Sequence, residues 1–190
     1  MLTERFSLAF ELATKAHSGQ TRKGTNIPYI SHPMAVASIA LEYGADEDQA
    51  IAALLHDAVE DGGAIYAQKI SEEFGPRVAA IVEGCTDGVP GVNGQKGPWE
   101  ERKTKYLRHL SSATDDVLLV SAADKLHNIR SIITDLEVVG EDVFRRFSSP
   151  KERTLWYYES LAGIYSSRDV VMAEEIERSI TVLKRKANKT

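Results

Sequence analysis

Apolar residues recur at the spacing of an α-helix along nearly the whole chain, and no segment of any length alternates as a half-buried β-strand does. In the first segment, Phe6, Ala9, Phe10 and Ala13 lie near this spacing. Glycines and prolines divide the segments and mark where helices begin and end. The pattern predicts helices over residues 3–17, 33–43, 46–61, 65–74, 76–84, 98–112, 114–138, 150–165 and 168–186. We therefore predict an all-α fold.

The length of 190 residues suits one domain over 1–190, with a core over about 3–165 and a C-terminal helix over about 168–186. A net charge of −5 argues against broad binding to nucleic acids or anionic membranes, although a local basic patch could hold a small phosphorylated ligand. The single cysteine, Cys85, excludes an internal disulfide and fits a reducing compartment. The chain lacks a long apolar run and the apolar core of a signal peptide, so we expect a cytoplasmic protein.

One long loop interrupts the helical pattern. Residues 84–98, GCTDGVPGVNGQKGP, contain five glycines and two prolines. Loops of this length inside compact domains are usually functional or mobile. The segment over 86–97 matches no fixed motif, so its role stays open.

Four polar residues end the expected helix over 46–61. On a continuous helix, His56 would lie over Glu60 and Asp57 over Asp61, because residues four apart share a face. Burying such a cluster would be costly without compensation, and a divalent cation is the simplest form of it. The alternative is an acidic helix end that faces water, but acidic residues at a helix C-terminus oppose its dipole.

The helix over 114–138 supplies a second cluster. Asp124 directly follows a segment that is apolar on nearly all sides, and Asn128 and Ser131 follow it on successive turns. A buried carboxylate needs a partner, which a shared metal would provide. A surface ion pair of Asp124 with Lys125 or Arg130 is an equal alternative.

A third candidate is His32, which precedes a proline that can open a helix. Such a loop histidine is more often an ordinary surface or capping residue. Taken as a set, however, His32, His56, Asp57 and Asp124 give two imidazoles and two carboxylates, a suitable ligand set for Mn²⁺, Fe²⁺ or Zn²⁺.

Basic residues that could bind phosphate, some beside aromatic rings, form three groups. They are Arg22 and Lys23; Lys96, Arg102, Lys103 and Lys105, with Trp99 and Tyr106 among them; and Arg153, with Trp156, Tyr157 and Tyr158. Each group alone also fits a solvated charged face. The chain has no Gly-x-Ser-x-Gly turn, no phosphate-binding loop that ends in Gly-Lys-Ser/Thr, and no activated cysteine. Metal-assisted hydrolysis is the strongest chemistry left.

Three motifs in order carry a family resemblance. RKGTNIPYISHP, ALLHDAVED and SAADKLHNIRS resemble the HD-superfamily hydrolase domain of the RelA/SpoT type, over residues 3 to about 165. With no synthetase or regulatory domain in this sequence, the chain resembles a stand-alone small alarmone hydrolase. The resemblance implies a compact, multi-helix HD-superfamily domain.

The resemblance also implies roles for individual residues. It makes His32, His56, Asp57 and Asp124 the ligands of one metal, usually Mn²⁺, and it makes Glu60 and Asp61 the pair that activates water. Substrate contacts fall on Arg22, Lys23, Asn128, Ser131, Arg153 and Tyr157, and we add Arg102 and Lys103 as phosphate-binding candidates. Two positions depart from the family, where threonine often replaces Gly62 and Ser131.

The resulting hypothesis is a metal-dependent hydrolase that removes the 3′-pyrophosphate of (p)ppGpp to give pyrophosphate and GDP or GTP. Its expected partner is a small purine nucleotide, with no nucleic acid or membrane. Alternatives are the same chemistry on adenosine alarmones, removal of the 2′-phosphate of NADPH, or a binding module without turnover. The oligomeric state cannot be inferred from the sequence.

Overall fold

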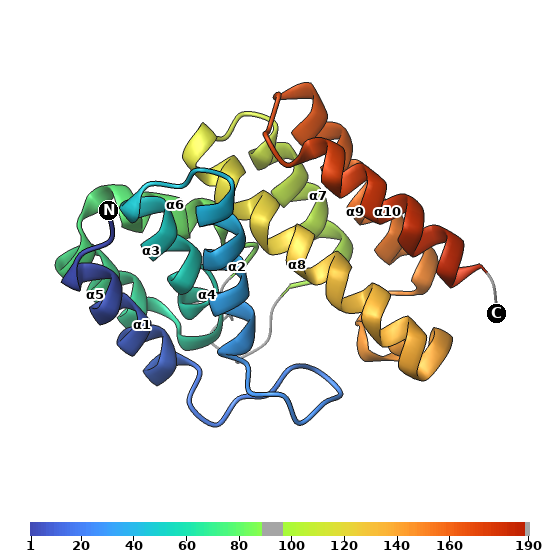
Figure 1. Ribbon diagram of the computed structural model, residues 1–190, viewed down its shortest axis with the longest axis horizontal. Helices are drawn as coiled ribbons and strands as arrows, with labels where there is room; N and C mark the ends of the chain where they lie inside the picture. The colour runs from blue at the N-terminus through green and yellow to red at the C-terminus, as the bar shows by residue number, and fades with distance from the viewer. Residues whose placement is uncertain (89–96, 189–190) are drawn as a thin grey trace.

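The computed structural model describes residues 1–88 and 97–188, in which helices pack without any strand of a sheet (Figure 1). An isolated bridge pairs Thr21 with Pro28. The predicted all-α fold is confirmed. The helices are α1 (Glu4–Ala16), α2 (Ser31–Glu42), α3 (Glu47–Leu55), α4 (Ala58–Gly62), α5 (Ala64–Phe74), α6 (Pro76–Cys85), α7 (Trp99–Leu110), α8 (Asp115–Val139), the 3₁₀ helix η1 (Gly140–Arg146), α9 (Lys151–Ser167) and α10 (Ala173–Ala187).

The longest helix, α8, passes through the middle of the molecule. In Figure 1 it runs between the α1–α6 group and the α9–α10 pair. Leu118, Val120 and Ala122 are at most 1% exposed, as expected for a helix that is apolar on nearly all sides. Thr114 caps its N-terminus by accepting a hydrogen bond from the Val117 amide. The helix therefore contributes to the core along its length and can present polar side chains only where a cavity reaches it.

The prediction of one continuous helix over 46–61 is wrong. The structure forms α3 and α4 instead, with His56 and Asp57 between them. Asp57 has φ −95° and ψ −9°, which departs from ordinary helical geometry and interrupts the hydrogen-bond ladder.

Other boundaries differ near the C-terminus. The helix expected from residue 168 begins at Ala173, because Arg168 caps α9 and Asp169 adopts a φ of +51°. The 3₁₀ helix η1 was not expected. Of the glycine-rich loop, residues 89–96 lie outside the described residues, and so does the candidate Lys96. Within the described part of the chain, we find no helix with the length and apolar character needed to cross a membrane.

Candidate metal centre

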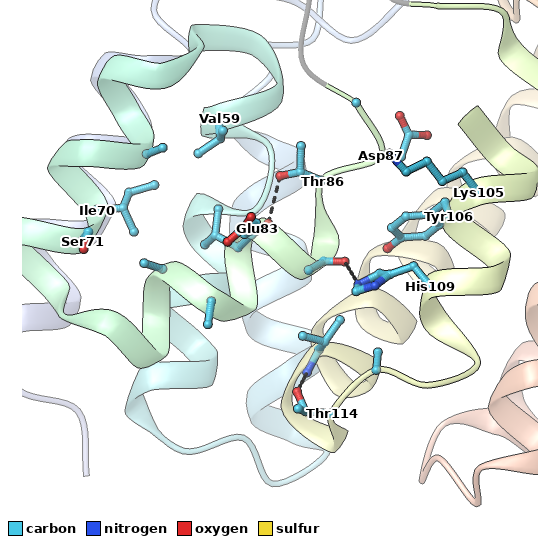
Figure 2. Close-up of a pocket in the computed structure, with 18 of the residues that line it drawn as sticks. Val59, Ile70, Ser71, Glu83, Thr86, Asp87, Lys105, Tyr106, His109 and Thr114 are labelled. Carbon is cyan, nitrogen blue, oxygen red and sulfur yellow. Dashed lines mark hydrogen bonds between the residues drawn. The ribbon is translucent and has the colours of Figure 1, made fainter. Parts of the chain in front are cut away.

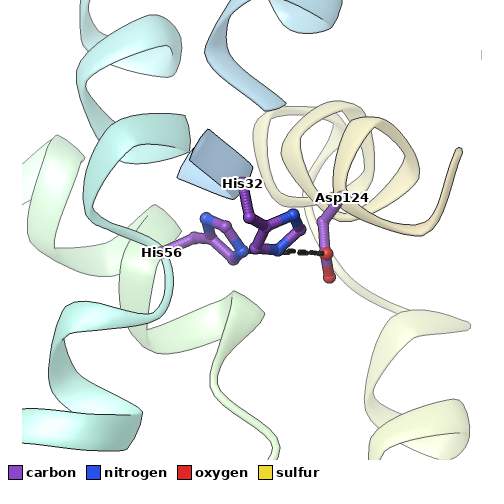
Figure 3. A group of neighbouring side chains, drawn as sticks. All are labelled: His32, His56 and Asp124. Carbon is purple, nitrogen blue, oxygen red and sulfur yellow. Dashed lines mark ion pairs between the residues drawn. The ribbon is translucent and has the colours of Figure 1, made fainter. Parts of the chain in front are cut away.

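Four side chains from three parts of the fold converge at one point. His32 belongs to the first turn of α2, His56 and Asp57 join α3 to α4, and Asp124 lies midway along α8. Figure 3 shows His32, His56 and Asp124 pointing toward one another. His32 Nε2 lies 3.4 Å from Asp57 Oδ2 and 3.2 Å from Asp124 Oδ1. His56 Nε2 lies 3.1 and 3.7 Å from the same two oxygens.

The cluster lies inside the protein. His32, His56 and Asp124 are only 1%, 2% and 6% exposed, and the Asp57 side chain is 17% exposed. The alternative of an acidic helix end that faces water therefore does not describe His56 or Asp57. Burying two imidazoles and two carboxylates together costs desolvation free energy. Interactions within the cluster must offset this cost.

The outer nitrogen of each imidazole is held by a neighbour. His56 Nδ1 lies 2.8 Å from the Ala53 carbonyl oxygen, so it carries a hydrogen and leaves Nε2 as the nitrogen that would bind a metal. His32 Nδ1 lies 2.7 Å from His127 Nδ1. Burial, with the nearby His32 and Arg22, lowers the pKa of His127 to about 4, so His127 is neutral and can accept the His32 hydrogen. Both Nε2 lone pairs can then face the centre, as in many metal sites.

The two carboxylates stay ionised despite their burial. Burial raises the pKa of Asp57, but His56 and His32 outweigh it and hold the pKa well below its usual value. Burial likewise raises the pKa of Asp124, and Lys125 with the two histidines reverses the shift. Tyr29 also donates its hydroxyl hydrogen to Asp57 Oδ2 at 2.7 Å. The centre is therefore rich in negative charge.

A divalent metal fits this donor set. His56 Nε2 is buried and makes no hydrogen bond within the described part of the chain, although Asp57 Oδ2 lies 3.1 Å away. This geometry indicates that nitrogen and oxygen are directed at a common point rather than at each other. Two imidazole nitrogens and two carboxylate oxygens suit Mn²⁺, Fe²⁺ or Zn²⁺. The ligand atoms of His32, His56 and Asp124 all lie within 4.8 Å of one another, which is close enough to share one ion.

The residues expected to activate water lie on α4. Glu60 is half-buried, and its charge raises the pKa of Lys103, although burial, the largest effect, leaves that pKa lowered overall. The Asp61 side chain lies outside the described residues. The roles of Glu60 and Asp61 stay predictions.

A cavity of about 560 Å³ adjoins the centre and collects four of the expected substrate residues, namely Arg22, Lys23, Asn128 and Ser131. Arg22 donates to Asn128 Oδ1 at 2.9 Å, and Asn128 Nδ2 donates to Asp124 Oδ1 at 2.5 Å. This relay connects a candidate metal ligand to a cation that lines the cavity. We call the cavity of about 560 Å³ the nucleotide cavity, after its expected ligand.

The other expected substrate residues lie elsewhere. Arg102 and Lys103 on α7 both pair with the buried carboxylate of Asp87. Lys103 Nζ lies 4.7 Å from the centre of the Tyr157 ring, and the buried Tyr157 hydroxyl has no hydrogen-bond partner among the described residues. Arg153 is not brought into either site, because it is 48% exposed and pairs with Glu100 at 3.0 Å.

A second cavity, of about 1010 Å³, lies between α5, α6, α7 and the start of α8. Figure 2 shows Tyr106 and His109 of α7 facing the α6 side, where His109 bonds the Gly84 carbonyl oxygen at 3.2 Å. Of the candidate phosphate-binding residues that the structure describes, Arg102 and Lys105 line it, and no described lining residue is common to both cavities.

Sequence analysis missed the contacts of four residues, of which three touch candidate ligands and the fourth, Asp87, pairs with cations of α7. Tyr29 and His127 contact candidate ligands, Lys125 pairs with Asp124, and Asp87 holds two cations of α7. A signal existed for two of them: Tyr29 lies within the motif that contains His32, and His127 lies one turn after Asp124. Lys125 was weighed only as a surface partner of Asp124, whereas its side chain is 13% exposed.

Comparisons with known proteins agree with this geometry. A family model described as HD domain matches residues 9–151. The chain is 42% identical over 125 residues to a probable GTP pyrophosphokinase of Mycobacterium leprae, covering 65% of this chain and 15% of that protein. It is 40% identical over 130 residues to a guanosine-3′,5′-bis(diphosphate) 3′-pyrophosphohydrolase of Aquifex aeolicus, covering 68% of this chain and 18% of that protein. The chain thus spans about a fifth or less of the length of these curated relatives.

Two solved structures share the fold. The lmo0812 protein of Listeria monocytogenes superposes with a TM-score of 0.68 at 27% identity, over 80% of this chain and 99% of that one. A metazoan ortholog of SpoT, described as hydrolysing ppGpp, superposes with a TM-score of 0.73 at 24% identity, over 100% and 99% of the two chains. The latter supports the fold alone. Since the family model covers most of the chain and includes all three motifs that carried the resemblance, the chain belongs to the HD domain family.

Proposed function

We propose that this chain is a metal-dependent hydrolase that removes the 3′-pyrophosphate of (p)ppGpp, giving pyrophosphate and GDP or GTP. The observation that carries the proposal is the convergence of His32, His56, Asp57 and Asp124 within 3.1–3.7 Å beside a cavity lined by basic residues. The Aquifex aeolicus relative is named for this reaction, and 68% of this chain aligns with it. We propose that residues 1–190 form one domain, because α10 packs on α8 and α9.

We propose Mn²⁺ as the metal, held by His32, His56, Asp57 and Asp124. Mixed imidazole and carboxylate ligands suit it, and the two histidines already have their outer nitrogens occupied. A cation bound here supplies Lewis-acid polarisation of a phosphoryl oxygen and lowers the pKa of water. Tyr29 and Asn128 fix the two carboxylates in place through their hydrogen bonds.

Glu60 and Asp61 are proposed to accept the proton of the attacking water. The water oxygen forms a bond to the phosphorus attached to the ribose 3′-oxygen, the bond between that phosphorus and the 3′-oxygen breaks, and a proton ends on the 3′-oxygen. A pair of carboxylates on α4 suits this proton transfer, because one can orient the water while the other takes the proton.

The basic residues are proposed to bind the phosphates and to stabilise charge that develops on them. Arg22 and Lys23 line the nucleotide cavity, and Asn128 and Ser131 lie beside them on α8. Lys103, held by Asp87 over the Tyr157 ring, is proposed to reach the phosphates from α7. Such preorganised cations act most strongly where water is excluded. We propose lesser phosphate contacts for Arg102, which pairs with Asp87, and for Arg153, which would have to leave Glu100.

The test is a product assay on metal-stripped protein with Mn²⁺ added back. Guanosine and adenosine 3′-pyrophosphates and NADPH are compared side by side, with His56→Ala as the site variant and His109→Ala, in the other cavity, as the matched control. We expect pyrophosphate release from the guanosine substrate that depends on Mn²⁺ and is lost only in His56→Ala. Phosphate release from NADPH alone, or nucleotide binding without turnover, would contradict the proposal.

A further inference from the structure

We propose that Asp135 and Arg146 form a reader for the guanine base at the end of the nucleotide cavity away from the metal centre. The inference rests on the proposed function and names the base that the cavity accepts. Both residues line the cavity, and neither was a candidate from the sequence. They pair directly, with Arg146 donating to Asp135 Oδ2 at 2.8 Å.

The spacing along α8 places this pair at a suitable distance from the metal. Asp124, Asn128, Ser131 and Asp135 follow one another at intervals of four, three and four residues, so they lie on one face of the helix. Asp135 lies about 16 Å along the axis from Asp124, at 1.5 Å per residue. A nucleoside that extends along this face, with its 3′-phosphate at the centre, places its base near Asp135.

The pair is built into the cavity wall. The Arg146 and Asp135 side chains are 19% and 34% exposed, so each keeps one side toward the cavity while being partly desolvated. Arg146 also packs against the loop that carries Arg22 and Lys23. At Gly24 (φ +73°), an added Cβ would lie 2.7 Å from Arg146 Cδ, so only glycine allows the loop to approach this closely.

The surroundings suit a purine ring. Val143, Phe147 and Tyr158 line the same cavity and provide apolar and aromatic surface near the pair. Base recognition in single nucleotides commonly combines such surface with hydrogen bonds to the Watson–Crick edge. The wall and the ion pair together supply both elements.

The chemistry of the pair favours guanine over adenine. Guanine presents two donors, N1–H and N2–H₂, beside the acceptor O6. The carboxylate of Asp135 can accept from both donors, while the guanidinium of Arg146 donates to O6. Adenine presents an unprotonated N1, whose lone pair would face the carboxylate, and its amino group replaces the acceptor that Arg146 requires. Leaving such partly buried groups unpaired costs affinity.

A nearby ion pair offers a matched comparison. Arg145 and Asp142, on the same 3₁₀ helix, lie 3.1 Å apart, but they are 83% and 65% exposed and line neither cavity. An exposed ion pair of this kind contributes little to stability, and this one does not line a cavity where it could contact a base. Replacing Asp142 therefore removes the same charge as replacing Asp135, on the 3₁₀ helix that carries Arg146, without touching the proposed reader.

The experiment measures binding of GDP and ADP by calorimetry in the presence of Mn²⁺, using the wild-type chain, Asp135→Asn, Arg146→Gln and the control Asp142→Asn. We expect the wild type to bind GDP at least about tenfold more tightly than ADP, as one bidentate base contact allows. Asp135→Asn and Arg146→Gln should weaken GDP binding by about tenfold or more and leave ADP binding within about twofold. The Asp142→Asn variant should match the wild type, and thermal melting checks that each variant is folded.

The outcomes separate this inference from the proposed function. Equal binding of GDP and ADP by the wild type, or equal weakening of both in Asp135→Asn, would overturn the reader even if (p)ppGpp is hydrolysed. A GDP preference that disappears in Asp135→Asn would support the reader even if no substrate is turned over, in which case the proposed function alone fails.

Discussion

At the scale of single residues, the charge states of the candidate ligands reflect two opposing effects. Burial, the largest effect, lowers the pKa of His56, but Asp57 and Asp124 reverse the shift and raise it well above its usual value. The same attraction keeps both carboxylates ionised. The carboxylates that raise the pKa of His56 would equally favour a metal cation at the same point, where it would take the place of the proton on Nε2. The charge of the site therefore favours cations in general and does not by itself distinguish one ion from another.

Tyr29→Phe tests the support given to one carboxylate. The substitution removes the hydrogen bond to Asp57 but keeps the ring that packs against His17 at 4.8 Å. We expect Mn²⁺ affinity to fall by about 10- to 100-fold, the usual effect of losing a group that orients a ligand. Metal titration by calorimetry measures it. Tyr43→Phe, which loses a hydroxyl bonded to the distant Glu175, should bind Mn²⁺ like the wild type.

Asp87→Asn tests the buried carboxylate that holds α7. Burial raises the pKa of Asp87, but Lys103 and Arg102 outweigh it and lower the pKa overall. A depressed folded-state pKa gives stability that is present above the unfolded value of about 4 and is lost as pH falls through the folded value. We expect Asp87→Asn to lower the free energy of unfolding by about 3–5 kcal/mol at pH 7, because two largely buried cations lose their partner.

Denaturant unfolding between pH 3 and pH 7 measures this effect. The wild type should lose stability on acidification more steeply than Asp87→Asn, because the variant has no carboxylate to protonate. Asp115→Asn, at a side chain that is 95% exposed, should follow the wild-type curve. Parallel curves for wild type and Asp87→Asn would show that protonation of Asp87 is not linked to folding, which contradicts its lowered pKa.

The sequence predicted which residues are candidate ligands, but it could not predict the side chains that contact them. His56, Asp57 and Asp124 stand out because they directly follow apolar helical segments, and His32 stands out only when it is taken together with them. The roles of Tyr29 and His127 depend on contacts between residues 28 and 95 positions apart, which no local pattern encodes. The geometry around the ligands is therefore a product of the tertiary fold.

At the scale of helices, the interruption between α3 and α4 governs the site. A local helical pattern continues across His56 and Asp57, so sequence periodicity predicts one helix where the fold forms two. The same limit explains why η1 and the start of α10 were missed, since both depend on how the chain turns back onto α8. The remaining helices were predicted well, because apolar spacing and glycine or proline breaks mark them directly.

Gly62 gives the short helix α4 a steric constraint that can be tested. An added Cβ at Gly62 would lie 2.3 Å from Tyr66 Cδ2, so the ring of Tyr66 occupies the space that a larger residue needs. This contact explains why glycine stands where the family often has threonine. We expect Gly62→Ala to lower the free energy of unfolding by about 1–3 kcal/mol through overpacking.

A double-mutant cycle with Tyr66→Ala tests the cause. The cost of Gly62→Ala should largely disappear when Tyr66 is already alanine, because the clashing ring is absent. Gly163→Ala is the matched control, since an added Cβ there meets nothing within 4 Å and alanine favours the helix. If the Gly62→Ala cost is the same with and without Tyr66, the steric explanation is wrong.

At the scale of the whole molecule, the candidate centre joins parts of the chain that are distant in sequence. Its four ligands come from α2, the α3–α4 junction and α8, and these elements also pack on one another. An ion that binds only when they are assembled must stabilise the assembled state. The centre is thus a structural link as well as a candidate reaction site.

Mn²⁺ should therefore raise the thermal stability of the protein. At a free concentration of about 100 times Kd, binding to the folded state alone adds about 2.7 kcal/mol. Thermal melting with Mn²⁺ and with a chelator measures the shift, which should vanish in Asp124→Asn. A shift of equal size in Asp124→Asn would place the binding site elsewhere.

A row of polar residues, Asp124, Asn128, Ser131 and Asp135, lies on one face of α8. The constant rise of the helix fixes the distances between them. Deleting one residue between Asp124 and Asp135 would rotate everything beyond it by about 100° and shorten the span by about 1.5 Å. A substitution in this stretch alters one contact, whereas a deletion turns the distal half of the row, and the apolar face opposite it, away from their partners. We expect the length of this helix to be held more strictly than its composition.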